Sequence, residues 1–331
     1  MPARTMHQER ARLAARMALS AGIALYGCTS GAQEFPSRQI TIVVPVPAGG
    51  GSDTFARLIA QKLSTAFGRV VLVDNRAGAG STIGTEYAAR AQPDGHTLLY
   101  VSAAVMLMNT FYPKLSIDTR RDLAPITMTV SIPMLLITHP SLPARNVKEL
   151  VALAKAKPGI LSYGSGGVGG AQHLAMELLR FKTGLEANHV PYRGAAPLQV
   201  SLLSGETQLG FLVIPLAQSH LKTGRLRALA ISARKRSSNV PGIPTLHESG
   251  IADYEAVQWQ SMFSPAKVPA PVIDRLHREI LKAVTAADMK ERITMEGADL
   301  VGNSPREFAA YYQSESAKWA DIVKRSGVKL E

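Results

Sequence analysis

Ile40-Thr-Ile-Val-Val-Pro-Val46 runs directly into Pro47-Ala-Gly-Gly-Gly-Ser-Asp53, and this junction decides the fold class. The first run is apolar on both faces, which is typical of a central parallel strand. The glycine-rich run predicts a turn, and the apolar residues that follow it recur at helical spacing. We therefore expect a strand, a turn and an amphipathic helix, with Ser52 or Asp53 as the helix N-cap. The apolar positions of this helix are Phe55, Leu58, Ile59, Leu63 and Phe67.

The alternation of β-rich runs and helical patterns continues along the chain, which predicts an α/β fold with a doubly wound sheet. Asn146 with Glu149 and Ser304 with Glu307 have the spacing of capping boxes, and Gly327 is an expected helix stop. No Pro/Gly-rich linker separates two halves, so we expect the chain to cross between any two domains on strands. The expected crossings are residues 134–138 and 257–264, and further strands are expected at 70–73, 97–101, 160–163, 209–214 and 226–231.

Length and composition exclude several classes of protein. The chain has 331 residues, of which 46% are hydrophobic and 19% charged, a balance typical of one large or two medium globular domains. The formal net charge is +12, but Lys and Arg are scattered along the sequence, so we expect no nucleic-acid partner. Cys28 is the single cysteine, which excludes an internal disulfide and a multi-cysteine metal site.

The N-terminal residues have the pattern of an export signal. Four arginines precede an apolar stretch at residues 17–26, which is too short to span a bilayer. Small residues before Gln33 favour a signal peptide over residues 1–32. In the alternative interpretation, residues 25–28 form a lipoprotein box and Cys28 carries a lipid anchor. Either cleavage predicts a periplasmic protein.

Two glycine-rich turns are candidate anion sites. Residues 49–53 and Leu161-Ser-Tyr-Gly-Ser-Gly-Gly-Val-Gly-Gly170 each lead into an expected helix. Backbone N–H groups at a helix N-terminus lack partners inside the helix and, with the helix dipole, favour an anion. The alternative is that each is a tight turn that merely needs glycine. A third such turn, at residues 78–84, is more typical of a structural turn.

Gly164, Gly166 and Gly169 also satisfy the spacing of a dinucleotide-binding fingerprint, and Glu186 follows Gly166 by 20 residues. A nicotinamide-dependent oxidoreductase is therefore a competing hypothesis. However, the acidic residue of that motif should end the next strand, whereas this strand is expected to end near Arg193. At such a strand end, Arg193 could pair with a carboxylate.

Catalytic patterns are hard to find in this sequence. It contains neither a nucleophile elbow nor a zinc-protease motif, and its eight histidines are well separated. His173 is expected in the core or behind a site, and Asp53 and Asp74 are expected to make caps and loop contacts. Trp259 and Met262 are expected to lie in the core or line a cleft. We therefore expect no enzyme activity, no cofactor and no metal.

Several segments, in order and at the expected spacing, resemble those of the Bug-type periplasmic receptors, the substrate-binding components of tripartite tricarboxylate transporters. The resemblance extends over nearly the whole chain after the expected export signal. Its segments include Val44-Pro-Val-Pro-Ala-Gly-Gly-Gly-Ser-Asp53, Val73-Asp-Asn-Arg-Ala-Gly-Ala-Gly80, Asp122-Leu-Ala-Pro-Ile126, Leu161-Ser-Tyr-Gly-Ser165, His189-Val-Pro-Tyr-Arg-Gly194, Leu226-Arg-Ala-Leu-Ala230 and Pro244-Thr-Leu-His-Glu248.

This resemblance implies a two-lobed Venus flytrap of the type II periplasmic-binding-protein kind, with mixed sheets flanked by helices and two crossing strands as hinge. The expected lobes are residues 33–134 with 258–331, and residues 135–257. In the family, backbone groups and ordered waters from the two glycine-rich turns hold a ligand carboxylate. The expected ligand-binding residues are Gly49, Gly50, Gly51, Ser52, Asp53, Ser102, Ala103, Ser165, Gly166, Gly167, Val168, Gly169 and Arg193. The expected hinge or cleft-lining residues are Val257, Trp259 and Leu212.

The implied function is capture of a small organic carboxylate and its delivery to membrane permease subunits, by a protein expected to be a monomer. An alternative is a receptor whose liganded form regulates a sensor. One departure bears on the ligand: family members often carry Asp after the strand that here reads Phe211-Leu-Val-Ile214. An amino group would lack a counter-ion there, which favours a carboxylate with an apolar body, such as an aromatic or aliphatic dicarboxylate.

Overall fold

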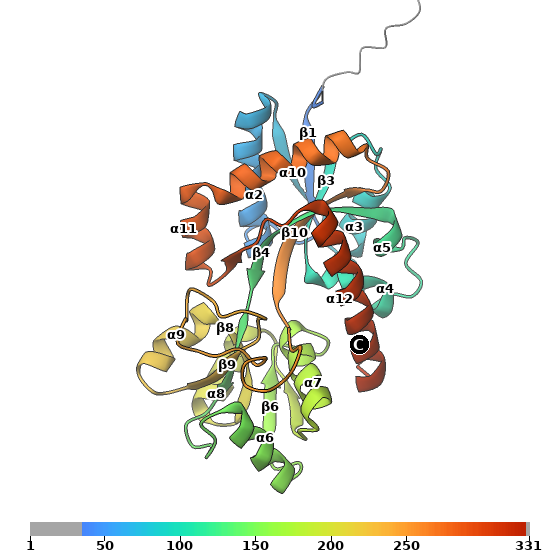
Figure 1. Ribbon diagram of the computed structural model, residues 1–331. Coiled ribbons are helices and arrows are strands. Elements are labelled where there is room, and N and C mark those ends of the chain that lie inside the picture. The colour runs from blue at the N-terminus through green and yellow to red at the C-terminus, as the bar shows by residue number, and fades with distance from the viewer. Residues whose placement is uncertain (1–34, 329–331) are drawn as a thin grey trace, which may run out of the picture. The chain divides into compact units, whose positions relative to one another are not determined.

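The first of two sheets has six strands and is mixed, as Figure 1 shows for a computed structural model that describes residues 35–328. Its strands are β1 (Ile40–Val44), β2 (Val71–Asn75), β3 (Thr97–Ser102), β4 (Leu123–Ile132), β10 (Gln258–Pro265) and β11 (Asp299–Leu300), in the order β11-β4-β10-β3-β1-β2. β1 pairs in parallel with β2 and β3, whereas β10 runs antiparallel to β3 and β4. Parallel pairing on both sides explains why β1 is apolar on both faces.

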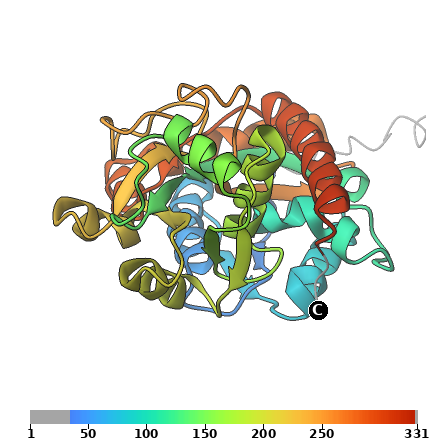
Figure 2. The same cartoon turned by 90° about the horizontal axis from the view of Figure 1, so that it is seen from below.

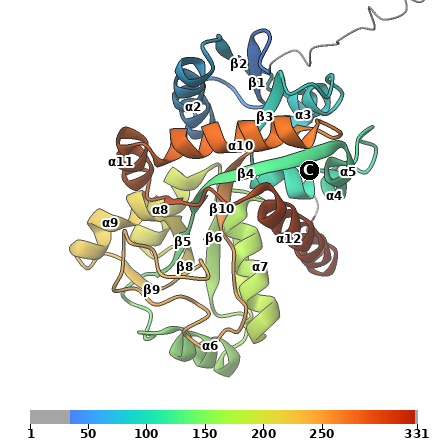
Figure 3. The ribbon, with the colours of Figure 1, turned by 45° about the horizontal axis from the view of Figure 1, so that its top comes forward.

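Helices flank this first sheet, and α10 crosses it in Figure 3. α2 and α10 pack against each other, while α12 packs on β4 and on η2. The helices of this part are α2 (Gly51–Phe67), η1 (Ala79–Ser81), α3 (Thr82–Ala89), η2 (Ala103–Leu107), α4 (Met108–Phe111), α5 (Thr119–Asp122), α10 (Ala270–Thr285), α11 (Ala287–Met295) and α12 (Pro305–Ser326).

The second sheet has five strands in the order β7-β6-β8-β5-β9 and is also mixed. β6 pairs in parallel with β7 and β8, and β5 runs antiparallel to β8 and β9. Its elements are β5 (Met134–Thr138), α6 (Val147–Ala156), β6 (Ser162–Ser165), α7 (Ala171–Thr183), β7 (Asn188–Pro191), α8 (Ala195–Ser204), β8 (Leu209–Val213), α9 (Ile214–Lys222) and β9 (Arg227–Ile231).

The chain passes between the two sheets twice. It leaves the first sheet at the end of β4 and enters the second at β5, with only Pro133 between them. It returns from β9 to β10 through residues 232–257. Residues 134–138 and 258–265 are therefore strands, as expected, but each belongs to one sheet, and the change of sheet falls just before each of them. Two crossings and two mixed sheets make this the two-lobed fold that the sequence predicted.

The C-terminal helix joins the two parts. α12 packs against α7 of the second sheet as well as against the first sheet, and the two helices run side by side in Figures 2 and 3. Its start is fixed by Ser304, whose side chain accepts from the Glu307 N–H while Glu307 accepts from the Ser304 N–H, which confirms the capping box. Asn146 likewise accepts from the Glu149 N–H, and Gly327 ends α12 in the left-handed conformation, as expected.

One helix start differs from its prediction. α2 begins at Gly51 with Gly50 as N-cap, so neither Ser52 nor Asp53 caps it. The Asp53 carboxylate instead accepts from the N–H of Gly49, just before the helix. The expected signal peptide, residues 1–32, and Cys28 lie outside the described residues. Within residues 35–328, no helix is long and apolar enough to cross a membrane.

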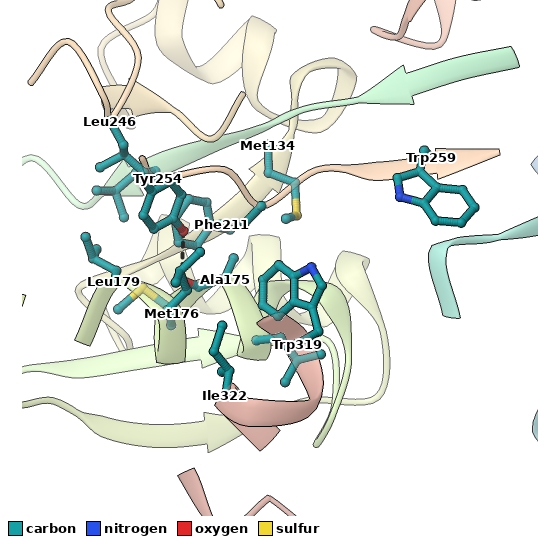
Figure 4. Packing of buried hydrophobic residues seen from close by; sticks show 14 of the residues in the cluster. Met134, Ala175, Met176, Leu179, Phe211, Leu246, Tyr254, Trp259, Trp319 and Ile322 are labelled. Carbon is teal, nitrogen blue, oxygen red and sulfur yellow. Dashed lines mark hydrogen bonds between the residues drawn. The ribbon is translucent and has the colours of Figure 1, made fainter. Parts of the chain in front are cut away.

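The interior contains an aromatic group under the first sheet and a second apolar group under α7. Trp259 lies edge-on to Phe308, and Phe263 packs against Phe308 and Tyr312. In the second group, the Tyr254 hydroxyl donates to the Ala175 carbonyl at 2.7 Å, a bond drawn in Figure 4. Both groups belong to one continuous core, which fixes the orientation of α12 and α7 relative to the sheets.

Candidate functional site

A cavity of about 420 Å³ lies where the elements of the two sheets meet. One wall comes from η2 and α4, which follow β3 of the first sheet. The opposite wall is the turn before α7 and the first turns of that helix, from the second sheet. The returning segment at residues 256–258 and Trp319 of α12 complete it. Its volume is within the range of small-molecule pockets, so it is the candidate ligand site.

Five of the expected site residues line this cavity. Ser102 and Ala103 form part of the η2 wall, Val168 and Gly169 belong to the turn before α7, and Val257 lies on the returning segment. They come from three separate stretches of the chain, and the crossing of the two sheets brings them together.

The first glycine-rich turn lies beside the cavity without lining it. Ser52 donates to the side-chain oxygen of Gln260 at 2.9 Å, and Gln260 pairs with the cavity residue Ser102 across β10 and β3. Asp53 holds the turn from behind, accepting from the Gly49 N–H at 2.9 Å and from Arg57 and Asn75 at 3.0 Å each. The start of α2 is thus two contacts away from the cavity wall.

Burial would raise the pKa of Asp53, but hydrogen bonds from Arg57, Gly49 and Asn75 outweigh it and the pKa falls below its ordinary value. The carboxylate is therefore ionised and engaged by three donors inside the protein. This is the loop-holding role expected for Asp53. Asp74 likewise pairs with Arg76, at 2.6 Å.

The second glycine-rich turn is braced by side chains beneath it. Gly169 donates its N–H to Nδ1 of His173 at 3.0 Å, and Gly167 donates to the Ser165 hydroxyl at 3.2 Å. Ser165 itself is fully buried and lies 2.7 Å from Nε2 of His189. The Gly167 and Gly169 N–H groups are therefore used within the turn, and so is that of Gly170, which donates to the Gly167 carbonyl at 3.2 Å. The N–H groups of the first helical residues, from Ala171 onward, remain for a ligand. Gly170 and Ala171, which precede and begin that helix, both line the cavity.

A buried polar cluster supports this turn. The rings of His173 and His189 are stacked with centroids 3.9 Å apart, and Tyr163 stacks on His189 at 4.8 Å and lies 6.1 Å from His173. Glu177 accepts from the Tyr163 hydroxyl and from Arg180, both at 2.7 Å. Burial lowers the pKa of both histidines, and the pKa of His189 falls to about 4 because it would also be repelled by His173 if both rings were protonated. Both rings are therefore neutral at pH 7.

The other expected site residues lie outside the cavity lining. Trp259 and Leu212 correct the expectation of cleft lining: both side chains are fully buried, Trp259 against Phe308 and Leu212 in the apolar core under β5 and β8. Arg193 is exposed on the loop after β7 and is not part of the wall. Also outside the lining are Gly49, Gly50, Gly51, Ser52, Asp53, Ser165, Gly166 and Gly167.

Sequence reasoning missed most of the apolar wall. Met106, Phe111 and Leu174 line the cavity, as do Met134 at the start of β5 and Trp319 of α12. In Figure 4 Trp319 and Met134 lie on the same side as Ala175, while Trp259 lies apart from them. Trp319 stands at helical spacing in an amphipathic helix, a pattern shared by core and cavity residues, so the sequence alone carries no signal that separates them.

The dinucleotide hypothesis finds no support in the geometry. Glu186 is exposed on the loop between α7 and β7, before the strand rather than at its end. The Gly169 N–H, which a pyrophosphate would need, is taken by His173. Within residues 35–328, no group of three or more His, Cys, Asp or Glu side chains could hold a metal ion.

Comparison with known proteins decides the family. The model of the tripartite tricarboxylate transporter family receptor, TctC, matches residues 55–328. The chain belongs to this family. BugT of Bordetella pertussis is 34% identical over 302 residues, which cover 91% of this chain and 93% of BugT. As a TctC receptor, the chain is a periplasmic binding protein and not an enzyme.

Two solved structures resemble this TctC receptor along nearly its whole length. Rpa4515 of R. palustris, solved with adipate, is 31% identical with a TM-score of 0.69 and covers 89% of this chain and 99% of its own. A TctC solute-binding protein from Polaromonas, solved with no ligand, is 27% identical with a TM-score of 0.82 and covers 88% and 99%.

Proposed function

We propose that this protein captures a small organic carboxylate in the cavity between its two sheets and delivers it to the permease of a tripartite tricarboxylate transporter. It acts in the periplasm after the expected export signal is removed. The ligand is a dicarboxylate or an aromatic acid. The observation that carries the proposal is the position of the start of α7, which turns backbone N–H groups and the positive end of a helix toward the cavity.

Two further observations support a carboxylate. The related Rpa4515 was solved with adipate. The polar cluster under the turn accepts hydrogen bonds from the Gly167 and Gly169 N–H groups. These bonds hold the start of α7 in one orientation. A site prepared before binding loses less entropy when the ligand enters, which favours affinity.

Closure of two lobes is the mechanism we propose. Lobe 1 comprises residues 35–133 with 258–328, and lobe 2 residues 134–257, which moves the expected boundary at residue 134 by one position to the point where the chain changes sheets. The ligand-free Polaromonas structure has the higher TM-score although its sequence identity is lower than that of the adipate complex. The higher TM-score to the ligand-free structure supports an open arrangement of the two lobes in this protein. From that arrangement, the start of α2 can approach the cavity when the lobes close.

A thermal-shift screen tests ligand capture, because a ligand that binds the folded state raises the melting temperature by mass action. The screen uses the chain from Gln33 onward against monocarboxylates, dicarboxylates, tricarboxylates, amino acids and NAD(H). A rise with carboxylates and a smaller radius of gyration in solution scattering are expected. A rise with NAD(H) alone would contradict the proposal, as would a uniform absence of shift. Uptake of the labelled ligand by cells with and without the receptor separates delivery to a permease from sensing.

A further inference from the structure

The walls of the cavity are mainly apolar. Methionine, leucine and aromatic side chains surround its interior, and none of its lining residues, all within the described part of the chain, carries a charged side chain. The polar groups are the side chains of Ser102, Tyr112 and Gln258 and the backbone at the start of α7. Phe111, Met108 and Trp319 contribute mainly carbon to the wall.

The charged groups behind the Trp319 wall are paired with one another. Trp319 donates its indole N–H to the buried Glu315 carboxylate at 3.1 Å, and Lys318 pairs with the same carboxylate at 2.5 Å. Glu255, next to the cavity residue Ala256, has its pKa raised by burial and by the charge of Glu315. Lys318 and Arg234 both act on Glu255, but Lys318 is paired with Glu315 and Arg234 with Asp253. A second ligand carboxylate placed at this end would lose its water and meet no cation in the cavity wall.

The ammonium group of an amino-acid ligand would also lack a partner of opposite charge inside the cavity. Glu315 is already engaged by Trp319 and Lys318, and no carboxylate lines the wall. The strand end at Phe211 and Leu212 is apolar, and both side chains are fully buried. An amino acid would therefore bring in a charge that this cavity leaves unpaired.

The volume suits an aromatic body. An apolar cavity of about 150 Å³ suffices to hold benzene. The cavity of about 420 Å³ therefore has room for one ring with a carboxylate-bearing side chain.

We propose that the ligand of this receptor is a monocarboxylate with an uncharged aromatic or branched apolar body, whose carboxylate meets the start of α7 and whose body fills the space between Phe111, Leu174 and Trp319. The inference rests on the proposed function and narrows its ligand class. It replaces the wider choice of dicarboxylate or aromatic acid with the arylalkanoate-like acids that the wall chemistry selects.

Calorimetric titration of the chain from Gln33 onward tests this choice with 3-phenylpropionate, 4-methylpentanoate, adipate, succinate and glutamate. We expect 3-phenylpropionate or 4-methylpentanoate to bind at least about tenfold more tightly than the other three. Preference for adipate or succinate would overturn the inference and leave carboxylate capture standing. Preference for glutamate would also overturn it. Absence of binding by all five acids would overturn the proposed function and the inference together.

A variant that introduces a positive charge tests where the apolar body of the ligand lies in the cavity. Phe111→Arg places a cation at the apolar end of the cavity, so adipate should gain affinity relative to 3-phenylpropionate by about tenfold. Phe181→Arg makes the same chemical change on the exposed surface of α7 and should leave the preference unchanged. Equal preferences in the two variants would overturn the proposed placement. Melting temperatures of both variants show whether a lost signal reflects unfolding.

Discussion

The imidazole rings of His173 and His189 are stacked 3.9 Å apart with their planes at 16°, directly beneath the turn that leads into α7. Such contact is tolerable only while the rings carry no like charges, because two imidazolium groups at this distance repel each other. Nδ1 of His173 must also be unprotonated to accept the Gly169 N–H. The conformation of the ligand-binding turn is therefore linked to the neutral state of two histidines.

We predict that the free energy of unfolding falls as the pH is lowered from about 6.5 to about 4. Burial lowers the pKa of His173, and lowers that of His189 to about 4, so the unfolded chain binds more protons than the folded one in this window. Stability is then fully present above the unfolded pKa and is lost as the pH falls toward the folded value. We expect a loss of about 2 kcal/mol from His189, less than its full shift because the ring is partly exposed. Urea unfolding at a series of pH values measures it.

The variant His189→Phe retains an aromatic ring against Tyr163 and His173 but cannot titrate. Its stability should depend on pH less steeply than that of the parent protein between pH 6.5 and 4. His220→Phe, in α9 and away from this cluster, should retain the parent's slope. Identical slopes in all three proteins would show that the stacked pair does not govern this pH dependence. Glu177 and Arg180, which also face the cluster, are unchanged in both variants.

Ala171→Pro should separate ligand binding from folding. Ala171 is the first residue of α7, a position where proline is favoured because its missing N–H has no partner within the helix. The preceding Gly170 has ψ 166°, which suits the residue before a proline. We expect the melting temperature to change by no more than about 2 °C, while carboxylate affinity falls by about tenfold as one charge-assisted hydrogen bond is lost.

Ala287→Pro is the matched control for this variant. Ala287 is the first residue of α11, follows a residue in an extended conformation and is exposed away from the cavity. It should leave both melting temperature and affinity unchanged. If Ala171→Pro binds carboxylates as tightly as Ala287→Pro does, the start of α7 is not the carboxylate site.

The strands and caps were predictable because their signals are local. β1 can be predicted from its continuous apolar run, which is typical of a strand buried on both faces. The capping box at Ser304 can be predicted because it involves only the residues of one helix turn. β4 was missed as a strand although it is the longest in the described chain, at ten residues. It contains Pro125, two threonines and a serine among its apolar residues and carries the irregular pairing with β10, so its pattern lacks the continuous apolar run of β1.

The site was only partly predictable because it is assembled across two sheets. Ser102, Gly169 and Val257, which were expected at the ligand site or cleft, line the cavity, since turns after strands are natural cleft positions. The cavity's apolar wall could not be separated from core, since Met134 and Trp319 follow the same periodicity as fully buried residues. Ser165 illustrates the opposite error, since it was expected to contact the ligand. Its hydroxyl instead points inward to His189 and gives that buried imidazole a hydrogen-bond partner.

Asp53→Asn should destabilise the protein. The carboxylate has three donors from the turn, from α2 and from β2, and an amide oxygen can serve them only in part. We expect the free energy of unfolding to fall by about 1–3 kcal/mol, measured by urea denaturation at pH 7. Asp288→Asn removes the exposed partner of Lys62, an ion pair that solvent screens, and should reduce the stability less than Asp53→Asn does. Equal losses in the two variants would mean that the buried contacts of Asp53 add nothing beyond a surface ion pair.

Trp319 should report ligand entry by its own fluorescence. The chain has two tryptophans, and only Trp319 lines the cavity, whereas Trp259 is fully buried against Phe308. An apolar ligand body that displaces water beside the Trp319 indole should shift its emission to shorter wavelength. Trp259 should contribute a constant background, since it is fully buried and does not line the cavity.

Single-tryptophan variants assign this signal. Trp259→Phe should retain the ligand-induced shift, and Trp319→Phe should lose it while still binding the ligand by calorimetry, within about tenfold of the parent affinity, because a phenyl ring still covers part of the wall. The opposite assignment, a shift retained in Trp319→Phe and lost in Trp259→Phe, would place the ligand elsewhere in the molecule. The two measurements together distinguish binding in this cavity from binding at any other carboxylate site, because calorimetry counts all sites and the Trp319 emission reads only this wall.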